Sequence, residues 1–227
     1  MITVAQAPPS DRALFIRRTY THLAGAIAAF IAIEYILFTT GIAGAITNML
    51  AGSRFVWLAI LGGFALLGWF ARSLIARAKS GEQEYLGLGI YIVAEAIIFA
   101  PILYIAAYVV GNDVLPIAVA LTLLLFAGLT AIAFTTRRDF SFLRGFLTVG
   151  GFVALGLIVC SVIFGFTLGL IFSGAMVIFA SAAILYDTSK VMHHYSTTQH
   201  VVAALELFAS VALLFWYVLR IVMAMRR

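Results

Sequence analysis

The chain has 227 residues, of which 64% are hydrophobic and 10% are charged, and its mean hydropathy is +1.14. A soluble domain carries about 25% charged and about 45–50% apolar residues, so this composition excludes the soluble class. The formal net charge of +5 does not indicate nucleic-acid binding, because the basic residues fall mostly in short loops and tails, as membrane topology requires. The single Cys160 lies in an apolar run, which excludes a disulfide framework.

The apolar segments predict an all-α, polytopic membrane protein with a bundle of seven transmembrane helices, each of about 20 residues. The first apolar run is longer than the roughly 7–15 residues of a cleaved signal peptide, so we expect it to be a retained span. The uncharged stretch Gly145–Tyr186 corresponds to about 60 Å of helix, twice the hydrocarbon thickness, and must fold back once, around Gly165–Gly169. The expected spans are residues 20–42, 55–71, 86–110, 114–134, two within 145–186, and 201–223. Residues 1–19 are expected to form a cytoplasmic tail, and 20–227 a single membrane domain.

The basic residues predict the orientation of the bundle. They concentrate in the N-terminal tail and in the loops that follow the second, fourth and sixth spans, whereas the opposite side offers only Arg54 in its loops. We therefore expect a multi-pass protein of the bacterial inner membrane with a cytoplasmic N-terminus and the lipid bilayer as its surroundings. Seven spans place the C-terminus outside, although Arg226 and Arg227 favour the inside, and a re-entrant seventh segment would return the tail there.

Four acidic residues lie inside the expected spans or at their rim. Glu34, Glu95 and Glu206 fall within the first, third and seventh spans, and Asp187 closes the sixth. At about 1.5 Å per residue, Glu95 lies near the bilayer centre, Glu206 in the inner third and Glu34 toward the outer third. The four acids are thus spread from one face of the membrane to the other, and we call this arrangement the acidic ladder. It suits a cation or proton path, because carboxylate oxygens can replace the hydration shell of a hard cation. The alternative is that each glutamate is protonated and hydrogen-bonded to a neighbouring helix.

Arg72 and Asp187 both lie at cytoplasmic ends of spans, where an ion pair between them would form a pH-sensitive gate. The alternative is two ordinary interfacial charges that reach into the headgroups. The loop histidines His193, His194 and His200 have no metal-ligand spacing, so we expect no metal site. The chain has no Walker sequence, Gly-x-Ser-x-Gly or His-Glu-x-x-His, so we expect neither an enzyme nor a resident cofactor.

Three motifs carry a family resemblance. They are Arg18-x-Tyr20-x-x-Leu23-Ala-Gly25 at the first span, Thr135-Thr-Arg-Arg-Asp139-Phe-Ser141-Phe142-Leu143 after the fourth, and Ile184-Leu-Tyr-Asp187-Thr188-Ser189 at the end of the sixth. Together with the span pattern, they make nearly the whole chain resemble the Bax inhibitor-1 family, its bacterial YccA-type branch in particular. The resemblance implies a seven-helix membrane bundle with the last helix at its centre.

The resemblance also implies a possible activity, because some members of the family behave as pH-sensitive calcium leaks. They use an aspartate on span six, a second on span seven and an arginine from span two; Asp187 and Arg72 match the first and the last of these. Counting back from Arg220 places Ser210 at the second aspartate, with Glu206 one turn earlier on the same face. Two carboxylates can share a proton and titrate as a unit, whereas an aspartate and a serine cannot. That Glu206 replaces the missing aspartate is a hypothesis.

Two functional classes follow from the resemblance. In the first, the chain is a calcium or cation leak with Asp187 as proton sensor, and Asp187, Glu95 and Glu206 line a wet path. In the second, it is a non-transporting modulator of a membrane-bound AAA protease of the FtsH type, as members of the YccA-type branch are. In this class, Asp187, Glu95 and Glu206 would be buried and neutral, and the cytoplasmic tail and loops would contact the protease. A transporter with coupled substrate movement would be indicated by inverted repeats, and none is visible.

Overall fold

The computed structural model describes residues 3–51, 62–63, 66–68, 70–75 and 81–226, and within them the chain is helical without a β-strand. A shorter apolar helix, Leu66–Ile75, runs over residue 69, which lies outside the described residues. The other elements are η1 (Val4–Gln6), α1 (Pro9–Thr39), α2 (Ile42–Ala51), α4 (Gly81–Ile105), the π-helix η2 (Ala106–Val110), α5 (Val114–Thr136), α6 (Leu143–Phe164), α7 (Leu170–His193) and α8 (His200–Met225).

Six helices of the described part are long and apolar enough to cross a membrane: α1, α4 with η2, α5, α6, α7 and α8. They correspond to six of the seven predicted spans. The remaining one, residues 55–71, falls largely outside the described residues, so the count of seven is not established. The described part of the chain is nevertheless helical, and the length and composition of these helices make the chain a multi-pass membrane protein.

The predicted fold-back of the uncharged stretch is confirmed. Helix α6 ends at Phe164 and α7 begins at Leu170, so the turn occupies Gly165–Gly169. Gly165 has φ +76°, a left-handed conformation that glycine adopts without the steric cost of a β-carbon. The two helices also approach closely, because a β-carbon at Gly150 would lie 2.9 Å from the Phe179 ring. Small residues at such contacts let helices pack in a bilayer.

The described part of residues 1–19, which we expected to form a cytoplasmic tail, contains the start of a long helix. Helix α1 begins at Pro9, where the fixed φ of proline suits the first turn of a helix. Before it, the fully buried Val4 donates its backbone N–H to the Tyr195 carbonyl at 2.9 Å, which docks the N-terminal segment on the loop between α7 and α8. The polar composition of these residues concealed that Pro9 begins a helix and that Val4 is buried. The ten-residue helix α2 was also missed, because it is too short to register as a span.

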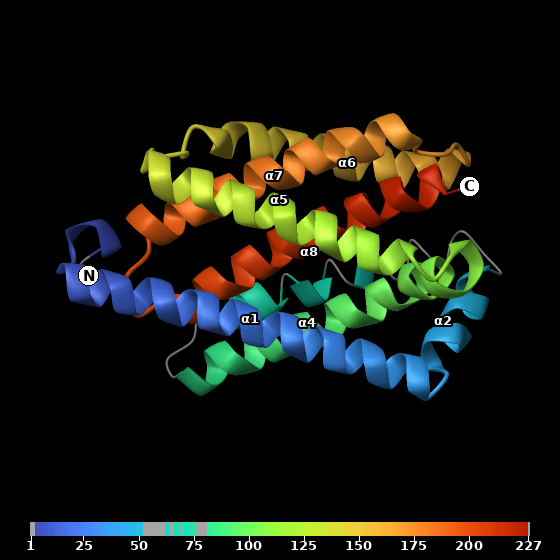
Figure 1. Cartoon of the computed structure of the whole chain (residues 1–227), viewed down its shortest axis with the longest axis horizontal. Helices are drawn as coiled ribbons and strands as arrows, with labels where there is room; N and C mark the ends of the chain where they lie inside the picture. The colour runs from blue at the N-terminus through green and yellow to red at the C-terminus, as the bar shows by residue number, and fades with distance from the viewer. Residues whose placement is uncertain (1–2, 52–61, 64–65, 69, 76–80, 227) are drawn as a thin grey trace.

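Helix α8 lies at the centre of the bundle, as the resemblance implies. It packs against α1, α4, α5 and α7, and Figure 1 shows it running between the pair α1 and α4 and the layer of α5, α6 and α7. Its side chains fill the core, with Leu205, Leu207, Leu214 and Leu219 almost fully enclosed. Helix α6, by contrast, packs mainly on α7 and exposes large apolar side chains such as Phe152 and Leu155. Such an apolar outer face suits contact with lipid.

The two chain termini lie at opposite ends of the bundle (Figure 1). The end that holds the N-terminus also holds the end of α5 and the end of α7, which meet near Arg12, Arg137 and His193. We call it the basic end. It is the end that the distribution of charges predicts to be cytoplasmic.

Candidate functional site

Asp187 and Ser210 face each other inside the basic end of the bundle. Asp187, in the last turns of α7, is 8% exposed, and Ser210, in α8, is 7% exposed. The Ser210 hydroxyl donates a hydrogen bond of 2.5 Å to Asp187 Oδ2. The position at which the resemblance implies a second aspartate therefore touches Asp187 directly. Because a hydrogen bond to a carboxylate is stronger than one between neutral groups, this contact ties α7 to α8.

A second polar link joins the same two helices one turn away. The Lys190 ammonium forms an ion pair with Glu206, and the Tyr195 hydroxyl donates to Glu206 Oε2 at 2.6 Å. Lys190 Nζ also lies 5.4 Å and 5.0 Å from the ring centroids of Tyr186 and Tyr195, within the range of a cation–π interaction. Burial, and then the neighbouring Glu206 carboxylate, raise the pKa of Tyr195, so its hydroxyl stays a donor at neutral pH. Glu206 is thus held by two donors of its own and makes no hydrogen bond to Asp187 among the described residues.

The expected ion pair between Arg72 and Asp187 is not formed in the part of the chain that the structure describes. The Arg72 guanidinium instead lies over the Tyr91 ring of α4, with its carbon 5.9 Å from the ring centroid. Its charge still interacts electrostatically with the carboxyl groups of Glu95 and Asp187. The difference has a physical reason: Ser210 donates to Asp187, and the face of Tyr91 offers the guanidinium a site that needs no carboxylate.

Glu34 and Glu95 point into the bundle, as the predicted ladder requires. Glu34 is 7% and Glu95 is 6% exposed. Both carboxyl oxygens of Glu34 and Oε2 of Glu95 have no hydrogen-bond partner among the described residues. A buried polar atom without a partner is costly. No hydrogen bond between described residues joins either glutamate to Asp187, so the four acids do not form a continuous chain of contacts.

The loop between α5 and α6 docks onto the end of α7, a contact that the sequence did not predict. Asp139 Oδ1 accepts hydrogen bonds from the Ser141 hydroxyl at 2.5 Å and the Ser141 N–H at 2.9 Å, and Oδ2 pairs with His194 Nε2 at 3.1 Å. The Ser141 hydroxyl, with its backbone N–H and His194, lowers the pKa of Asp139 to about 2. Ser189, two residues after Asp187, accepts from the Phe140 N–H at 3.0 Å.

The sequence contains a signal for the turn within this loop, though not for its contact with α7. Asp139-x-Ser141 directly before a helix is a pattern in which an aspartate accepts from the backbone two residues on. What the pattern does not give is the partner on α7. Two of the three motifs behind the resemblance thus meet at the basic end. Among the described residues no group of three or more His, Cys, Asp or Glu side chains is placed to hold a metal ion.

Comparison with known proteins shows the family of the chain. The family model described as "Inhibitor of apoptosis-promoting Bax1" matches residues 12–227, which include both motifs at the basic end. The chain is 42% identical over 112 residues to the uncharacterized protein PA2604 of Pseudomonas aeruginosa, in a match that covers 49% of this chain and 50% of that relative. It therefore spans about half the length of this relative.

A second relative is matched over more of the chain. The uncharacterized protein NMA0420 of Neisseria meningitidis serogroup A is 28% identical over 179 residues, which cover 77% of this chain and 76% of the relative. The family model itself extends over nearly all of the described helices. The chain belongs to the Bax inhibitor-1 family.

Proposed function

We propose that the protein is a pH-modulated calcium or cation leak of the bacterial inner membrane, with Asp187 as its proton sensor and its basic end in the cytoplasm. The observation that carries this proposal is the buried hydrogen bond from Ser210 to Asp187, which links α7 to the central α8. A proton on Asp187 removes the negative charge that strengthens this bond. Protonation therefore weakens a link between two packed helices at a place where water is largely excluded.

The proposed gate also includes the second polar link between α7 and α8. The ion pair between Lys190 and Glu206 and the hydrogen bond from Tyr195 close the same interface one turn away from Ser210. If α7 moves away from α8, Asp187 carries the proton and the carboxylate of Glu206 becomes free to ligate a hard cation through oxygen. The gate is thus a two-state element in which protonation favours the separated arrangement.

Calcium flux tests the proposal. Native protein and Asp187→Asn, whose side chain cannot ionise, are compared in proteoliposomes at mildly acidic and mildly alkaline pH. We expect native flux to change with pH and the variant to lose that response. Asp113→Asn is a matched control, because Asp113 pairs with Arg226 at the opposite end of the bundle and should leave the pH response unchanged. Native flux no greater than that of empty liposomes would overturn the proposal.

The serine at position 210 gives a sharper test of the sensor. Ser210→Asp places a second carboxylate within contact of Asp187, so that the two acids must share a proton when they lie together. We expect the pH dependence of flux to become steeper than in the native protein. Glu206→Gln tests the hypothesis that Glu206 replaces the missing aspartate. That hypothesis fails if the variant keeps the native flux and the native pH response.

A second candidate function is a non-transporting modulator of a membrane-bound AAA protease of the FtsH type. It is favoured by the burial of Glu34 and Glu95, and by the ordered docking of the Asp139 loop at the expected cytoplasmic face. This candidate predicts that the protease co-purifies with the protein after cross-linking in membranes. It also predicts that Ser141→Ala, which removes the shortest bond to Asp139, weakens that association while calcium flux stays at background.

A further inference from the structure

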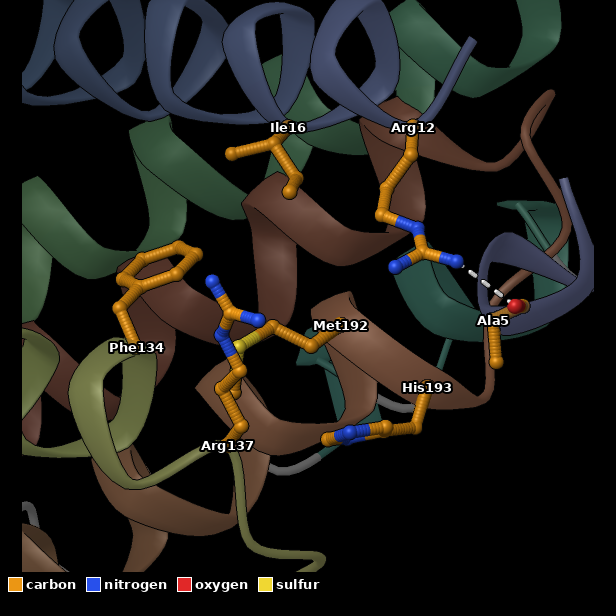
Figure 2. Close-up of a pocket in the computed structure, with 7 residues that line it drawn as sticks. All are labelled: Ala5, Arg12, Ile16, Phe134, Arg137, Met192 and His193. Carbon is orange, nitrogen blue, oxygen red and sulfur yellow. Dashed lines mark hydrogen bonds between the residues drawn. The ribbon is translucent and has the colours of Figure 1, made fainter. Parts of the chain in front are cut away.

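A cavity of about 610 Å³ opens at the basic end, between the N-terminal segment, α1, the end of α5 and the end of α7. Figure 2 shows the guanidinium groups of Arg12 and Arg137 extending into it from opposite walls, with His193 across from Arg12. Its apolar wall includes Phe134 and Met192. None of the functional classes considered above uses this cavity.

The cavity gathers cationic donors without a counter-charge. Arg12 donates through Nε to the Val4 carbonyl at 3.1 Å and through Nη2 to the Ala5 carbonyl at 2.7 Å, which fixes its guanidinium at the rim. These bonds use two of the five N–H donors of an arginine side chain. The Arg137 guanidinium makes no hydrogen bond or ion pair with any residue that the structure describes, and no described acidic residue lines the cavity.

Arg137 has an unfavourable backbone conformation for an arginine, which indicates that its charged side chain has a function at this position. Arg137 ends α5 with φ +51°, in the left-handed conformation that non-glycine residues adopt rarely. Glycine or asparagine is the usual residue at such a cap. An arginine at this position has the steric disadvantage of a β-carbon and supplies a guanidinium that no described protein group neutralises.

His193 completes the polar side of the cavity. Its Nδ1 lies 3.0 Å from the Ser189 carbonyl, a contact in which the ring donates, and this fixes the orientation of the imidazole. The second ring nitrogen is not engaged in any described hydrogen bond. Three nitrogen-bearing side chains from three different elements thus converge on one space.

We propose that this cavity binds a phosphate group, and that the phosphate belongs to the headgroup of an acidic phospholipid. The planar fork of a guanidinium matches the geometry of phosphate oxygens, and two such forks here face one space. The site lies where α5 and α7 end, and the ends of spanning helices lie near the lipid headgroups. Basic pockets between helices on the cytoplasmic side, where we expect this end to lie, suit anionic headgroups. Phe134 and Met192 give the first methylene groups of an acyl chain an apolar surface. The proposal does not depend on the leak.

Lipid binding to the purified, full-length protein in neutral detergent tests the proposal. Native mass spectrometry measures the affinity for phosphatidylglycerol and for phosphatidylcholine in native protein, Arg137→Gln and Arg138→Gln. We expect Arg137→Gln to weaken phosphatidylglycerol binding by about tenfold, as for the loss of one charged hydrogen-bonding partner. Arg138→Gln is the matched control: it removes the same charge from the adjacent residue, which does not line the cavity. Phosphatidylcholine binding should be equal in all three proteins.

The outcomes separate the sources of the phosphate. Glutamine keeps the β-carbon of arginine, so the left-handed cap carries the same strain in the variant, and thermal unfolding without acidic lipid should be unchanged. If millimolar inorganic phosphate displaces phosphatidylglycerol from native protein and binds with similar affinity, the site takes free phosphate. If phosphate does not compete, the site takes the lipid. Equal losses in Arg137→Gln and Arg138→Gln, or no loss in either, would overturn the cavity as a phosphate site.

Discussion

Replacing Ser210 with alanine removes the donor from a buried carboxylate and leaves the rest of the α7–α8 interface in place. Asp187 Oδ2 then loses its hydrogen bond of 2.5 Å at a position that is 8% exposed. Leaving a buried acceptor without a partner costs about 1–3 kcal/mol, toward the upper part when the acceptor is charged. A loss of about 2 kcal/mol corresponds to a fall in Tm of about 4–8 °C for a chain of this length.

A double-mutant cycle with Asp187→Asn isolates the contact from the other effects of each substitution. The asparagine oxygen still accepts a hydrogen bond from Ser210, but it carries no charge, and charged hydrogen bonds are roughly twice as strong as neutral ones. We therefore expect Ser210→Ala to cost about half as much in the Asp187→Asn background. Thermal unfolding in one detergent, followed by circular dichroism for the native protein, both single variants and the double variant, measures the difference.

Ser181→Ala is the control for this cycle. Ser181 also lies in α7, but its hydroxyl donates only to the Val177 carbonyl of its own helix at 2.8 Å, so its loss should change Tm little. If Ser210→Ala lowers Tm no more than Ser181→Ala does, the hydrogen bond to Asp187 contributes nothing to the fold. The proposed gate would then have no link to release.

Three further predictions concern charge, backbone and pH. Glu206→Gln breaks the ion pair with Lys190, but the two side chains are 32% and 22% exposed, so after discounting for solvent screening we expect a loss of at most about 1 kcal/mol by thermal unfolding. Gly165→Ala should cost about 1 kcal/mol because of its positive φ. Gly156→Ala lies inside α6 with no atom within 4 Å of the added β-carbon, so by the same assay it should be neutral or stabilising by up to about 1 kcal/mol. Asp139 has an ordinary pKa of 3.8 that is lowered to about 2 in the fold, so its contribution is fully present above pH 4 and disappears as pH falls toward 2. In Asp139→Asn this acid-labile part of the stability should be absent, as unfolding curves recorded against pH would show.

Much of the fold follows from the distribution of charge and hydropathy, because a bilayer imposes a length on every span. The uncharged stretch Gly145–Tyr186 predicts two helices and the position of their turn, since one helix of that length would exceed the membrane. The same length criterion explains why helix α2 was missed: its ten residues are too few to be recognised as a membrane span. The start of α1 at Pro9 was missed because Arg12 and its polar neighbours suggest a solvated tail, whereas they form the first turns of a long helix.

Helical spacing predicts the candidate site only where its residues share one helix, whereas the pairing of position 210 with Asp187 was implied by the family resemblance. Ser210 and Glu206 lie one turn apart on α8, so their common face follows from helical spacing. The partner of each residue lies on another element, and spacing along the chain carries no information about that. Arg72 was therefore expected beside Asp187 and lies instead over Tyr91. In the same way, nothing in the sequence joined the Asp139 loop to His194.

The end of α7 has contacts that are relevant to both candidate functions. This end is held by α8 through Ser210, by the α5–α6 loop through His194, and by the N-terminal segment through the Tyr195 carbonyl. A movement that separates Asp187 from Ser210 must carry these attachments along or break them. A partner that binds the loop would therefore bias the state of Asp187, and a change at Asp187 would alter the surface that the loop presents. A leak and a protease modulator need not be built from different parts of this fold, because both would work by moving the end of α7 against α8.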